Sequence, residues 1–169
     1  MINALFAVDQ YGGMGLNGTL PWPHNSTDLQ NFKKLTTGHV VVMGRKSWDD
    51  PKLPKPLTGR TVYVATNRPT MYASVINGDI KEELIKLEAN HPGQTIWVVG
   101  GQQLLEQCDG IFDRIYLTHI KGSYKVDTRV QIKSILSGFR PVSASASPDS
   151  NCTLTVYENL FKRITRSPT

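Results

Sequence analysis

Short hydrophobic runs recur along the chain, and several of them are continuous rather than alternating. Continuous apolar runs are typical of strands that are covered on both faces, as in a parallel sheet. The stretch at 152–157 instead alternates apolar and polar positions, which predicts an antiparallel strand added late in the chain. The other runs predict strands at residues 2–8, 40–43, 62–65, 74–76, 96–99 and 115–118.

Three segments between these runs have the patterns of helices. The first is predicted to open with the capping-box pattern Thr27-Asp28-Leu29-Gln30 and to run to about residue 36. The second is capped by Asp79 and ends before residue 91, and the third follows Gly100-Gly101 and runs to about residue 107. Strands that alternate with helices predict an α/β domain, with a largely parallel sheet and crossover helices.

Two Pro- and Gly-rich stretches, residues 11–23 and 51–59, are longer than most connections in a compact domain. Loops of that length are more often functional than idle. The polar segment 143–151 is predicted to be a flexible connection, and the basic tail at 162–169 is predicted to be solvated. Because the chain has 169 residues and no internal repeat, we expect a single domain over residues 1–169.

Composition excludes several classes of protein. The net charge of +5 suits an anionic partner but is too diffuse to indicate nucleic acid. Cys108 and Cys152 lie far apart without a CxxC pattern, so no disulfide framework is expected. No apolar run approaches the ~18 residues of a membrane span, and the N-terminus lacks the basic region of a signal peptide. We therefore expect a cytoplasmic protein that does not bind membranes.

Asp28 is the first candidate for chemistry. It is placed in the first turn of a helix and shares a face with Phe32 and Leu35. One interpretation is an ordinary acid near a helix N-terminus, where the helix dipole favours negative charge. The other is a carboxylate aimed into an apolar pocket, where it would hold a polar, cationic or amidine-like group through charge-assisted hydrogen bonds.

Two strands run into glycines at predicted helix starts. These are Gly44-Arg45-Lys46-Ser47 and Gly100-Gly101-Gln102-Gln103. Free N–H groups at helix starts bind phosphates, although each turn could also be a tight junction with ion-paired surface residues. If both turns lie at the carboxyl ends of adjacent parallel strands, they suggest a ligand with more than one phosphate. The pattern matches neither Walker A nor GxGxxG, and the four histidines lack metal-ligand spacing, so no metal site is expected.

Six blocks resemble the dihydrofolate reductase family, in the family's order and near its spacings. They are 7–9 with 13–23, 28–33, 42–48, 57–60, 98–101 and 116–120, and they cover roughly residues 1 to 130. The resemblance implies a mostly parallel, eight-stranded sheet and NADPH-dependent reduction of 7,8-dihydrofolate to tetrahydrofolate. It also implies inhibition by antifolates. Because the sequence shows no extra apolar face, we expect a monomer. Two alternatives are a pyrimidine reductase on the same fold and a catalytically idle reductase-like binding protein.

The resemblance assigns roles to individual residues. Asp28 would hold the pterin ring, Thr118 would support this contact, and Arg60 would clamp the glutamate α-carboxylate through a guanidinium fork. Hydride would pass to pterin C6 and a proton to N5. Asp28 would act electrostatically, with an ordered water as a candidate donor. The implied catalytic residues are Asp28, Thr118, Leu20 and Trp22. The implied substrate-binding residues are Leu5, Asp28, Leu29, Phe32, Leu57, Arg60, Val99, Tyr116 and Thr118.

For NADPH, the resemblance implies that Gly100 and Gly101 are joined by a cis peptide and that residues 13–22 form a loop that closes over the nicotinamide. Asp127 would steady the closed loop. Asn67 stands where some members use another residue near the 2′-phosphate, and the adjacent Arg68 could substitute. The implied cofactor-binding residues are Ala7, Gly15, Asn17, Gly18, Leu20, Gly44, Arg45, Lys46, Ser47, Thr66, Asn67, Arg68, Val99, Gly100, Gly101, Gln102, Gln103 and Leu104.

Overall fold

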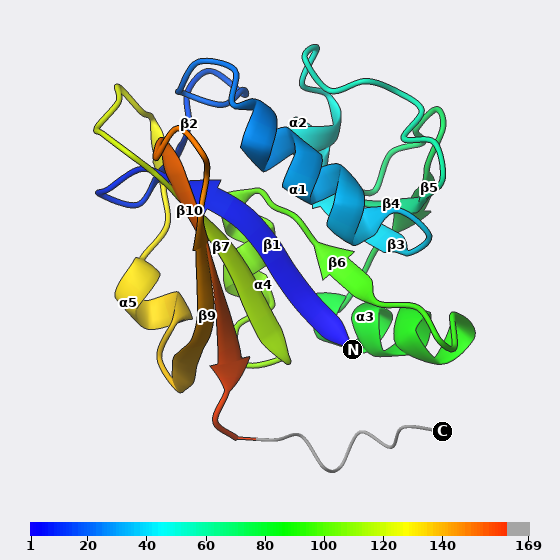
Figure 1. Cartoon of the computed structure of the whole chain (residues 1–169). Coiled ribbons are helices and arrows are strands. Elements are labelled where there is room, and N and C mark those ends of the chain that lie inside the picture. Colours follow the sequence, from blue (N-terminus) through cyan, green and yellow to red (C-terminus); the bar gives the residue numbers. More distant parts are fainter. Residues whose placement is uncertain (162–169) are drawn as a thin grey trace.

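Eight strands form one sheet in the order β5-β4-β3-β6-β1-β7-β10-β9 (Figure 1). The computed structural model describes residues 1–161, so the predicted solvated tail lies outside the described residues. Five neighbouring pairs are parallel, and β10 is antiparallel to both of its neighbours. This arrangement confirms the expected α/β fold with a mostly parallel, eight-stranded sheet. The strands are β1 (Ile2–Val8), β3 (Val40–Gly44), β4 (Thr61–Ala65), β5 (Ser74–Ile76), β6 (Ile96–Val98), β7 (Arg114–Ile120), β9 (Phe139–Ala146) and β10 (Cys152–Asn159).

A second sheet of two short strands lies among the loops. β2 (Gly13–Gly15) pairs antiparallel with β8 (Thr128–Arg129). β2 belongs to the long Gly-rich stretch at 11–23, so pairing with a distant segment orders part of this stretch. Neither strand was predicted, because three and two residues are too few to show a period of two.

Residues 1–161 contain five helices: α1 (Ser26–Thr36), α2 (Arg45–Trp48), α3 (Ile80–Asn90), α4 (Gln102–Gln107) and α5 (Ile132–Ile135). The three predicted helices are α1, α3 and α4. Asp79 caps α3 as predicted, since its carboxylate accepts a hydrogen bond from Glu82 N at 3.1 Å. The predicted opening of α1 at Thr27 is wrong. Asn25 caps this helix and accepts from Asp28 N at 3.0 Å, because asparagine satisfies a free first-turn N–H as well as threonine does.

The prediction of a flexible connection at 143–151 is wrong for its first half, which belongs to β9. This strand pairs with β10 at the edge of the sheet, and its side chains are mostly exposed, so no hydrophobic pattern marks it. The turn that follows is held by Ser147, whose hydroxyl accepts from Asn151 N at 3.1 Å and Cys152 N at 3.2 Å. The segment is therefore a strand and a hydrogen-bonded turn.

Hydrophobic clusters cover both faces of the sheet. In β3, Val40 and Val42 belong to the larger cluster and Val41 and Met43 to the second, as expected when successive side chains point to opposite faces. Phe32 of α1 packs against the second cluster, which places that helix over one face of the sheet. Both cysteines are free and buried, as the cysteine spacing predicts. None of the helices in residues 1–161 is long and apolar enough to cross a membrane.

Candidate active site

Most predicted site residues lie where the carboxyl ends of neighbouring parallel strands meet. Ala7, near the end of β1, pairs with Thr118 of β7, while Gly44 ends β3 and Gly100 follows β6. Figure 1 shows α1 and α2 at this end of the sheet. Open α/β sheets bind ligands in the crevice outside these strand ends. The fold therefore brings residues that are distant in the sequence to one edge.

Asp28 lies partly buried at the start of α1. Burial raises the pKa of its carboxyl above the ordinary range, because a charged group is poorly solvated there. The Thr118 hydroxyl faces the carboxylate and partly offsets the rise in pKa. This hydroxyl is itself fully buried and forms no complete hydrogen bond within residues 1–161. Asp28 also has no ion pair among the described residues. The pair thus has unused capacity for a ligand with N–H donors.

Apolar side chains form a wall beside this carboxylate. Leu57 is buried, and Phe32 and Val99 pack against the same cluster. Leu5 pairs with Tyr116 on the adjacent strand, and the Tyr116 ring stands edge-on to Trp97 with centroids 4.9 Å apart. The predicted Leu29, by contrast, is 43% exposed. These side chains suit a flat, partly aromatic ligand.

Arg60 lies at the end of this wall. Its Nε donates to Thr58 O at 3.1 Å and its Nη1 to Thr36 Oγ1 at 3.4 Å, and its Cζ is 5.8 Å from the centroid of the Phe32 ring. Partial burial lowers the pKa of the guanidinium. Within the described chain Arg60 forms no ion pair. The hydrogen bonds from Nε and Nη1 fix the Arg60 side chain. The other N–H groups of the guanidinium are available to bind a carboxylate.

The two strand-to-glycine turns pack directly against each other. Gly44 N donates to Gly100 O at 2.7 Å, and Gly100 and Gly101 are joined by a cis peptide bond, as the resemblance implied. A Cβ on Gly44 would lie only 3.4 Å from Gly101 N, and one on Gly101 would lie 3.6 Å from Ser47 Oγ. No side chain caps α2 or α4. The missing side chains leave a backbone-lined cradle that fits a phosphate group.

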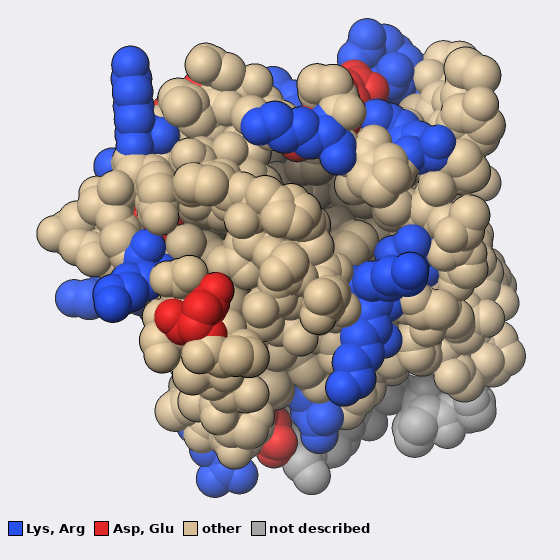
Figure 2. Space-filling view, turned by 45° about the horizontal axis from the view of Figure 1, so that its top comes forward, with Lys and Arg blue, Asp and Glu red and all other residues tan. Residues whose placement is uncertain are grey.

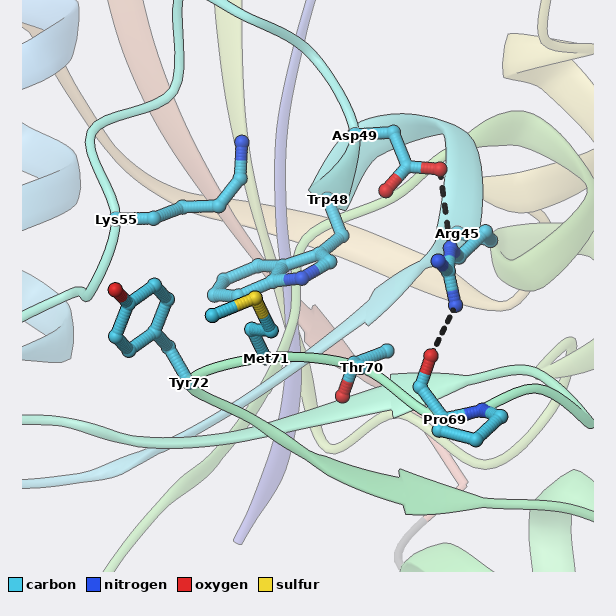
Figure 3. A pocket seen from close by; sticks show the side chains of 8 residues that line it. All are labelled: Arg45, Trp48, Asp49, Lys55, Pro69, Thr70, Met71 and Tyr72. Carbon is cyan, nitrogen blue, oxygen red and sulfur yellow. Dashed lines mark hydrogen bonds and ion pairs between the residues drawn. The ribbon is translucent and has the colours of Figure 1, made fainter.

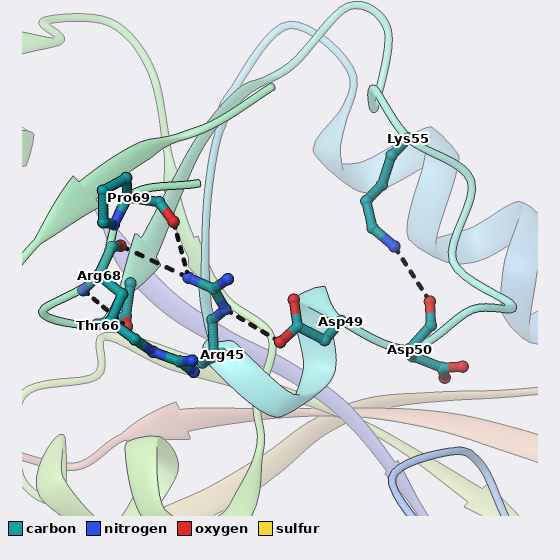
Figure 4. Close-up of polar contacts among 7 residues, drawn as sticks. All are labelled: Arg45, Asp49, Asp50, Lys55, Thr66, Arg68 and Pro69. Carbon is teal, nitrogen blue, oxygen red and sulfur yellow. Dashed lines mark hydrogen bonds and ion pairs between the residues drawn. The ribbon is translucent and has the colours of Figure 1, made fainter. Parts of the chain in front are cut away.

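Arg45 connects α2 to the turn after β4. Its Nε donates to Asp49 at 3.0 Å and its Nη1 to Pro69 O at 3.1 Å, with Arg68 O at 3.5 Å (Figure 4). In the same turn, Thr66 Oγ1 accepts from Arg68 N at 3.3 Å. The guanidinium thus holds the 66–69 turn in place. This arrangement leaves Lys46, Asn67 and Arg68 exposed beside the glycine turns.

A cavity of about 430 Å³ lies on the outer side of Arg45, between α2 and the segment after β4 (Figure 3). Its floor is the buried Trp48, with the Lys55 ammonium 5.6 Å from the indole centroid. Lys55 also donates to Asp50 O at 3.2 Å, and Met71 and Tyr72 flank the opening. Arg45 is the predicted site residue that lines this cavity.

The three residues of α4 that were predicted to bind the cofactor differ in the exposure of their side chains. The Gln102 amide donates to Glu106 at 2.9 Å, and Gln103 is exposed. Leu104 is buried in the larger core cluster, so its side chain does not face the cleft. The structure therefore separates the side chain of Leu104 from the other cofactor candidates.

The Gly-rich loop is folded against residues 124–129. Asn17 and Gly18 both have positive φ, as a tight hairpin turn requires, and Leu16 and Thr19 exchange backbone hydrogen bonds across it. Asn17 N donates to Asp127 Oδ2 at 2.9 Å. This bond is the main reason why the pKa of Asp127 is lowered. The turn is therefore held down by an exposed carboxylate.

Beyond this turn the loop places two predicted catalytic residues differently. Leu20 is 43% exposed, whereas Trp22 is buried in a cluster with Ile120 and Cys152, against which Ala7 packs. The Trp22 ring meets Tyr124 edge-on, with centroids 6.2 Å apart. Trp22 Nε1 is buried and has no partner within residues 1–161, so it is a free donor at the site.

Asp9 is a site-associated residue that the sequence analysis did not single out. It follows β1 directly, and its carboxylate is 1% exposed and surrounded by backbone N–H groups. A carboxylate at the end of an apolar strand, followed closely by a Gly-Gly pair, is the signal that would have indicated it. Within residues 1–161, no cluster of three His, Cys, Asp or Glu residues could hold a metal.

Positive charge is concentrated around this site. Residues 33–68 contain eight Lys or Arg and two Asp, a net charge of +6, whereas the whole chain has +5 and the rest therefore −1. Figure 2 shows Lys and Arg side chains around a hollow on this face, with few Asp or Glu. Such a field favours anionic ligands.

Comparisons with known proteins agree with this geometry. A family model described as dihydrofolate reductase matches residues 1–162. Dihydrofolate reductase type 8 of Escherichia coli is 31% identical over 145 residues, which cover 82% of this chain and 85% of that protein. Dihydrofolate reductase of Staphylococcus aureus (strain MSSA476) is 35% identical over 130 residues, or 75% and 76% of the two chains. That of Bacillus subtilis (strain 168) is 32% identical over 129 residues, or 75% and 73%. The chain belongs to the dihydrofolate reductase family.

Proposed function

We propose that this chain carries out its dihydrofolate reductase reaction with NADPH, in the cleft built around Asp28. The family supplies the reaction class, an oxidoreductase of folate and one-carbon metabolism. The observation that carries the assignment of the site is the partly buried Asp28 carboxylate, which faces the buried Thr118 hydroxyl, has a raised pKa and lacks an ion pair among the described residues. Such a group is costly to bury unless a ligand completes its hydrogen bonds.

Asp28 would accept hydrogen bonds from the two neighbouring N–H groups of the pterin, at N3 and the 2-amino group. A carboxylate has two acceptor oxygens and so matches this amidine-like edge. Thr118 supports the carboxylate from β7. Leu5, Phe32, Leu57, Val99 and Tyr116 would contact the flat rings, with Leu29 at the rim. Arg60 would grip the glutamate α-carboxylate at the far end of the apolar wall.

The residues of the glycine turns fit a dinucleotide with phosphates. NADPH, when bound, supplies the hydride that reduces C6 of dihydrofolate. Gly44, Gly100 and Gly101 give the backbone space that a phosphate needs. Lys46, Ser47, Thr66, Asn67 and Arg68 would contact the phosphates and the adenosine, with Arg45 holding their turn. Ala7, Gly15, Asn17, Gly18 and Leu20 would surround the nicotinamide half. At the start of α4, Gln102 would lie beside the glycine pair and Gln103 would reach the phosphate side, whereas Leu104, whose side chain lies in the core, would contribute only its backbone.

Reduction also requires a proton at N5. The raised pKa of Asp28 contributes here. This carboxyl keeps its proton up to a higher pH than an ordinary carboxyl does, so the site holds a proton near the pterin closer to neutral pH. The loop at 10–22, held by Asp127, would exclude bulk water while the hydride is transferred. Trp22 Nε1 is a buried free donor that could orient a single water there. The remaining parts of the proposal are that residues 1–161 act as one domain and that the protein is a cytoplasmic monomer inhibited by antifolates.

The experiment follows the loss of reduced-nicotinamide absorbance with purified protein and dihydrofolate, with NADPH and NADH assayed in parallel. We expect turnover with both substrates present and a lower KM for NADPH than for NADH. Equal kinetic constants for the two cofactors would contradict a contact of Asn67 or Arg68 with the 2′-phosphate, the group that NADPH has and NADH lacks. No turnover with either cofactor, in protein that still binds NADPH, would contradict the proposal for the substrate site.

A further inference from the structure

The Asp9 carboxylate collects three backbone N–H donors from two separate loops. Its Oδ1 accepts from Tyr11 N at 2.8 Å and from Gly13 N at 2.9 Å. Its Oδ2 accepts from Tyr124 N at 3.2 Å. The two oxygens therefore have different tasks, since Oδ1 shapes the base of the loop at 10–22 and Oδ2 reaches the segment at 121–127.

The Asp9 carboxylate is packed closely against both loops. A Cβ on Gly13 would lie 2.8 Å from Asp9 Oδ2 and 2.7 Å from Val126 Cγ1, so glycine is required for the loop to pass. Asp9 N also donates to Gly13 O at 2.9 Å, and Gln10 N donates to Gly122 O at 3.1 Å. The carboxylate is thus at the centre of the contact between the two loops.

The same two loops meet again further out, at an exposed site. Asp127 N donates to Gly15 O at 2.9 Å, and Asn17 N donates to the Asp127 carboxylate. The bond from Asn17 N to the Asp127 carboxylate is exposed to water, which competes for hydrogen-bonding groups, whereas the Asp9 carboxylate is buried and its three bonds are buried or part-buried. Buried hydrogen bonds to a charged acceptor are the more persistent kind. The loop therefore has an inner attachment that is shielded from water and an outer one that is exposed to it.

We propose that Asp9 is a positioning residue for the reaction, because its carboxylate fixes the base of the loop at 10–22 to the segment at 121–127. Asp9 does not touch substrate or cofactor. It sets where the loop starts, and so where Leu20 and Trp22 stand over the strand ends. This inference rests on the proposed function, since it assigns to Asp9 the placement of that loop during turnover.

The structure supplies a selective variant, Asp9→Asn. An amide has one oxygen that accepts two hydrogen bonds, which can stay on Tyr11 N and Gly13 N, and an NH₂ group that only donates. That NH₂ would face Tyr124 N–H, a second donor. The variant keeps the size of the side chain and the shape of the loop base but removes the bond from Tyr124 N, which is the link that the Asp9 side chain makes to the second loop.

The experiment measures kcat and KM for dihydrofolate together with amide hydrogen exchange of Tyr124 and Asn17. For Asp9→Asn we expect kcat to fall by roughly tenfold, which corresponds to about 1.4 kcal/mol, with the KM for dihydrofolate little changed and exchange faster at both amides. Asp79→Asn, which changes a helix cap distant from the loops, is the control and should change none of these.

Unchanged kcat in folded Asp9→Asn protein would overturn the proposal, and so would unchanged exchange at Tyr124. If that variant does not fold, Tyr124→Pro removes the same N–H and leaves the carboxylate, and Tyr124→Ala removes the ring but keeps the N–H. The proposal requires a lower kcat for Tyr124→Pro than for Tyr124→Ala, and equal values would overturn it. Absence of turnover in the wild-type protein would instead refute the proposed function, while the exchange rates would still report the coupling of the loops.

Discussion

Replacing Asp28 with asparagine should stabilise the protein at neutral pH. Burial raises the pKa of this carboxyl, and among the described residues no ion pair compensates the charge. A group whose pKa is raised on folding contributes its stability below the unfolded-state pKa, and this contribution is lost as the pH rises through the folded-state pKa. At neutral pH the folded protein therefore carries the cost of a buried, ionised carboxylate. A neutral amide of the same shape does not carry this cost.

The size of the gain is set by two opposing effects. Each unit of pKa elevation corresponds to about 1.4 kcal/mol of lost stability. In the first turn of α1, the helix dipole stabilises an acidic side chain by ~0.3–1 kcal/mol. Asp28→Asn removes this stabilisation as well. We expect a net increase in the free energy of unfolding and in Tm at neutral pH, because the cost of the poorly solvated, ionised carboxylate exceeds the benefit from the helix dipole.

The assay is urea unfolding of the wild-type protein, Asp28→Asn and Asp79→Asn, from about pH 4, near the ordinary carboxyl pKa, to about pH 8. The difference between Asp28→Asn and wild type should be smallest at the acidic end and grow as the pH rises. Asp79 is exposed, so its amide variant should not gain stability at neutral pH. A destabilised Asp28→Asn protein at neutral pH, or a difference independent of pH, would refute the reasoning.

Three further predictions concern the ligands. Arg60→Leu should raise the KM for dihydrofolate by roughly 10- to 100-fold, the equivalent of one charged hydrogen-bonded pair, and leave the Kd for NADPH unchanged; an unchanged KM would contradict the clamp. Gly44→Ala places a Cβ 3.4 Å from Gly101 N, and should weaken NADPH binding by roughly tenfold in a fluorescence titration; wild-type affinity would contradict the cradle. Finally, the +6 charge of residues 33–68 predicts that kcat/KM for dihydrofolate falls between ~0.01 M and ~1 M salt, as the Debye length shrinks from ~30 Å to ~3 Å; a salt-independent kcat/KM would exclude steering.

The sequence predicted the interior of the sheet better than its margins. β1 matches its predicted bounds and β3 differs from its prediction by one residue, because continuous apolar runs are a direct consequence of burial on both faces. The edge strand β5 also matches its predicted bounds, although two of its three residues are exposed. β9 was missed because an edge strand makes its hydrogen bonds through the backbone and needs no apolar side chains. The cap of α1 was misplaced by two residues because Asn25 and Thr27 are both good caps and only packing selects between them.

The site shows the same division between local and long-range information. The partial burial of Asp28 could be anticipated because an acid in line with Phe32 is unusual for an exposed helix face. The attachment of Asp9 to Tyr124 could not, since it joins residues 115 positions apart. The contacts of Arg45 with the backbone of residues 68 and 69 were equally hidden, because carbonyl acceptors leave no trace in the side-chain pattern.

The most direct test of the central claim is the rate of NADPH-dependent dihydrofolate reduction by wild-type protein and Asp28→Asn at neutral pH. Loss of a charge-assisted contact worth ~1.5–3 kcal/mol predicts that kcat/KM for dihydrofolate falls by roughly 10- to 100-fold while the Kd for NADPH stays the same. Comparable turnover in the two proteins would contradict the claim that the Asp28 carboxylate binds the pterin and is required for its reduction.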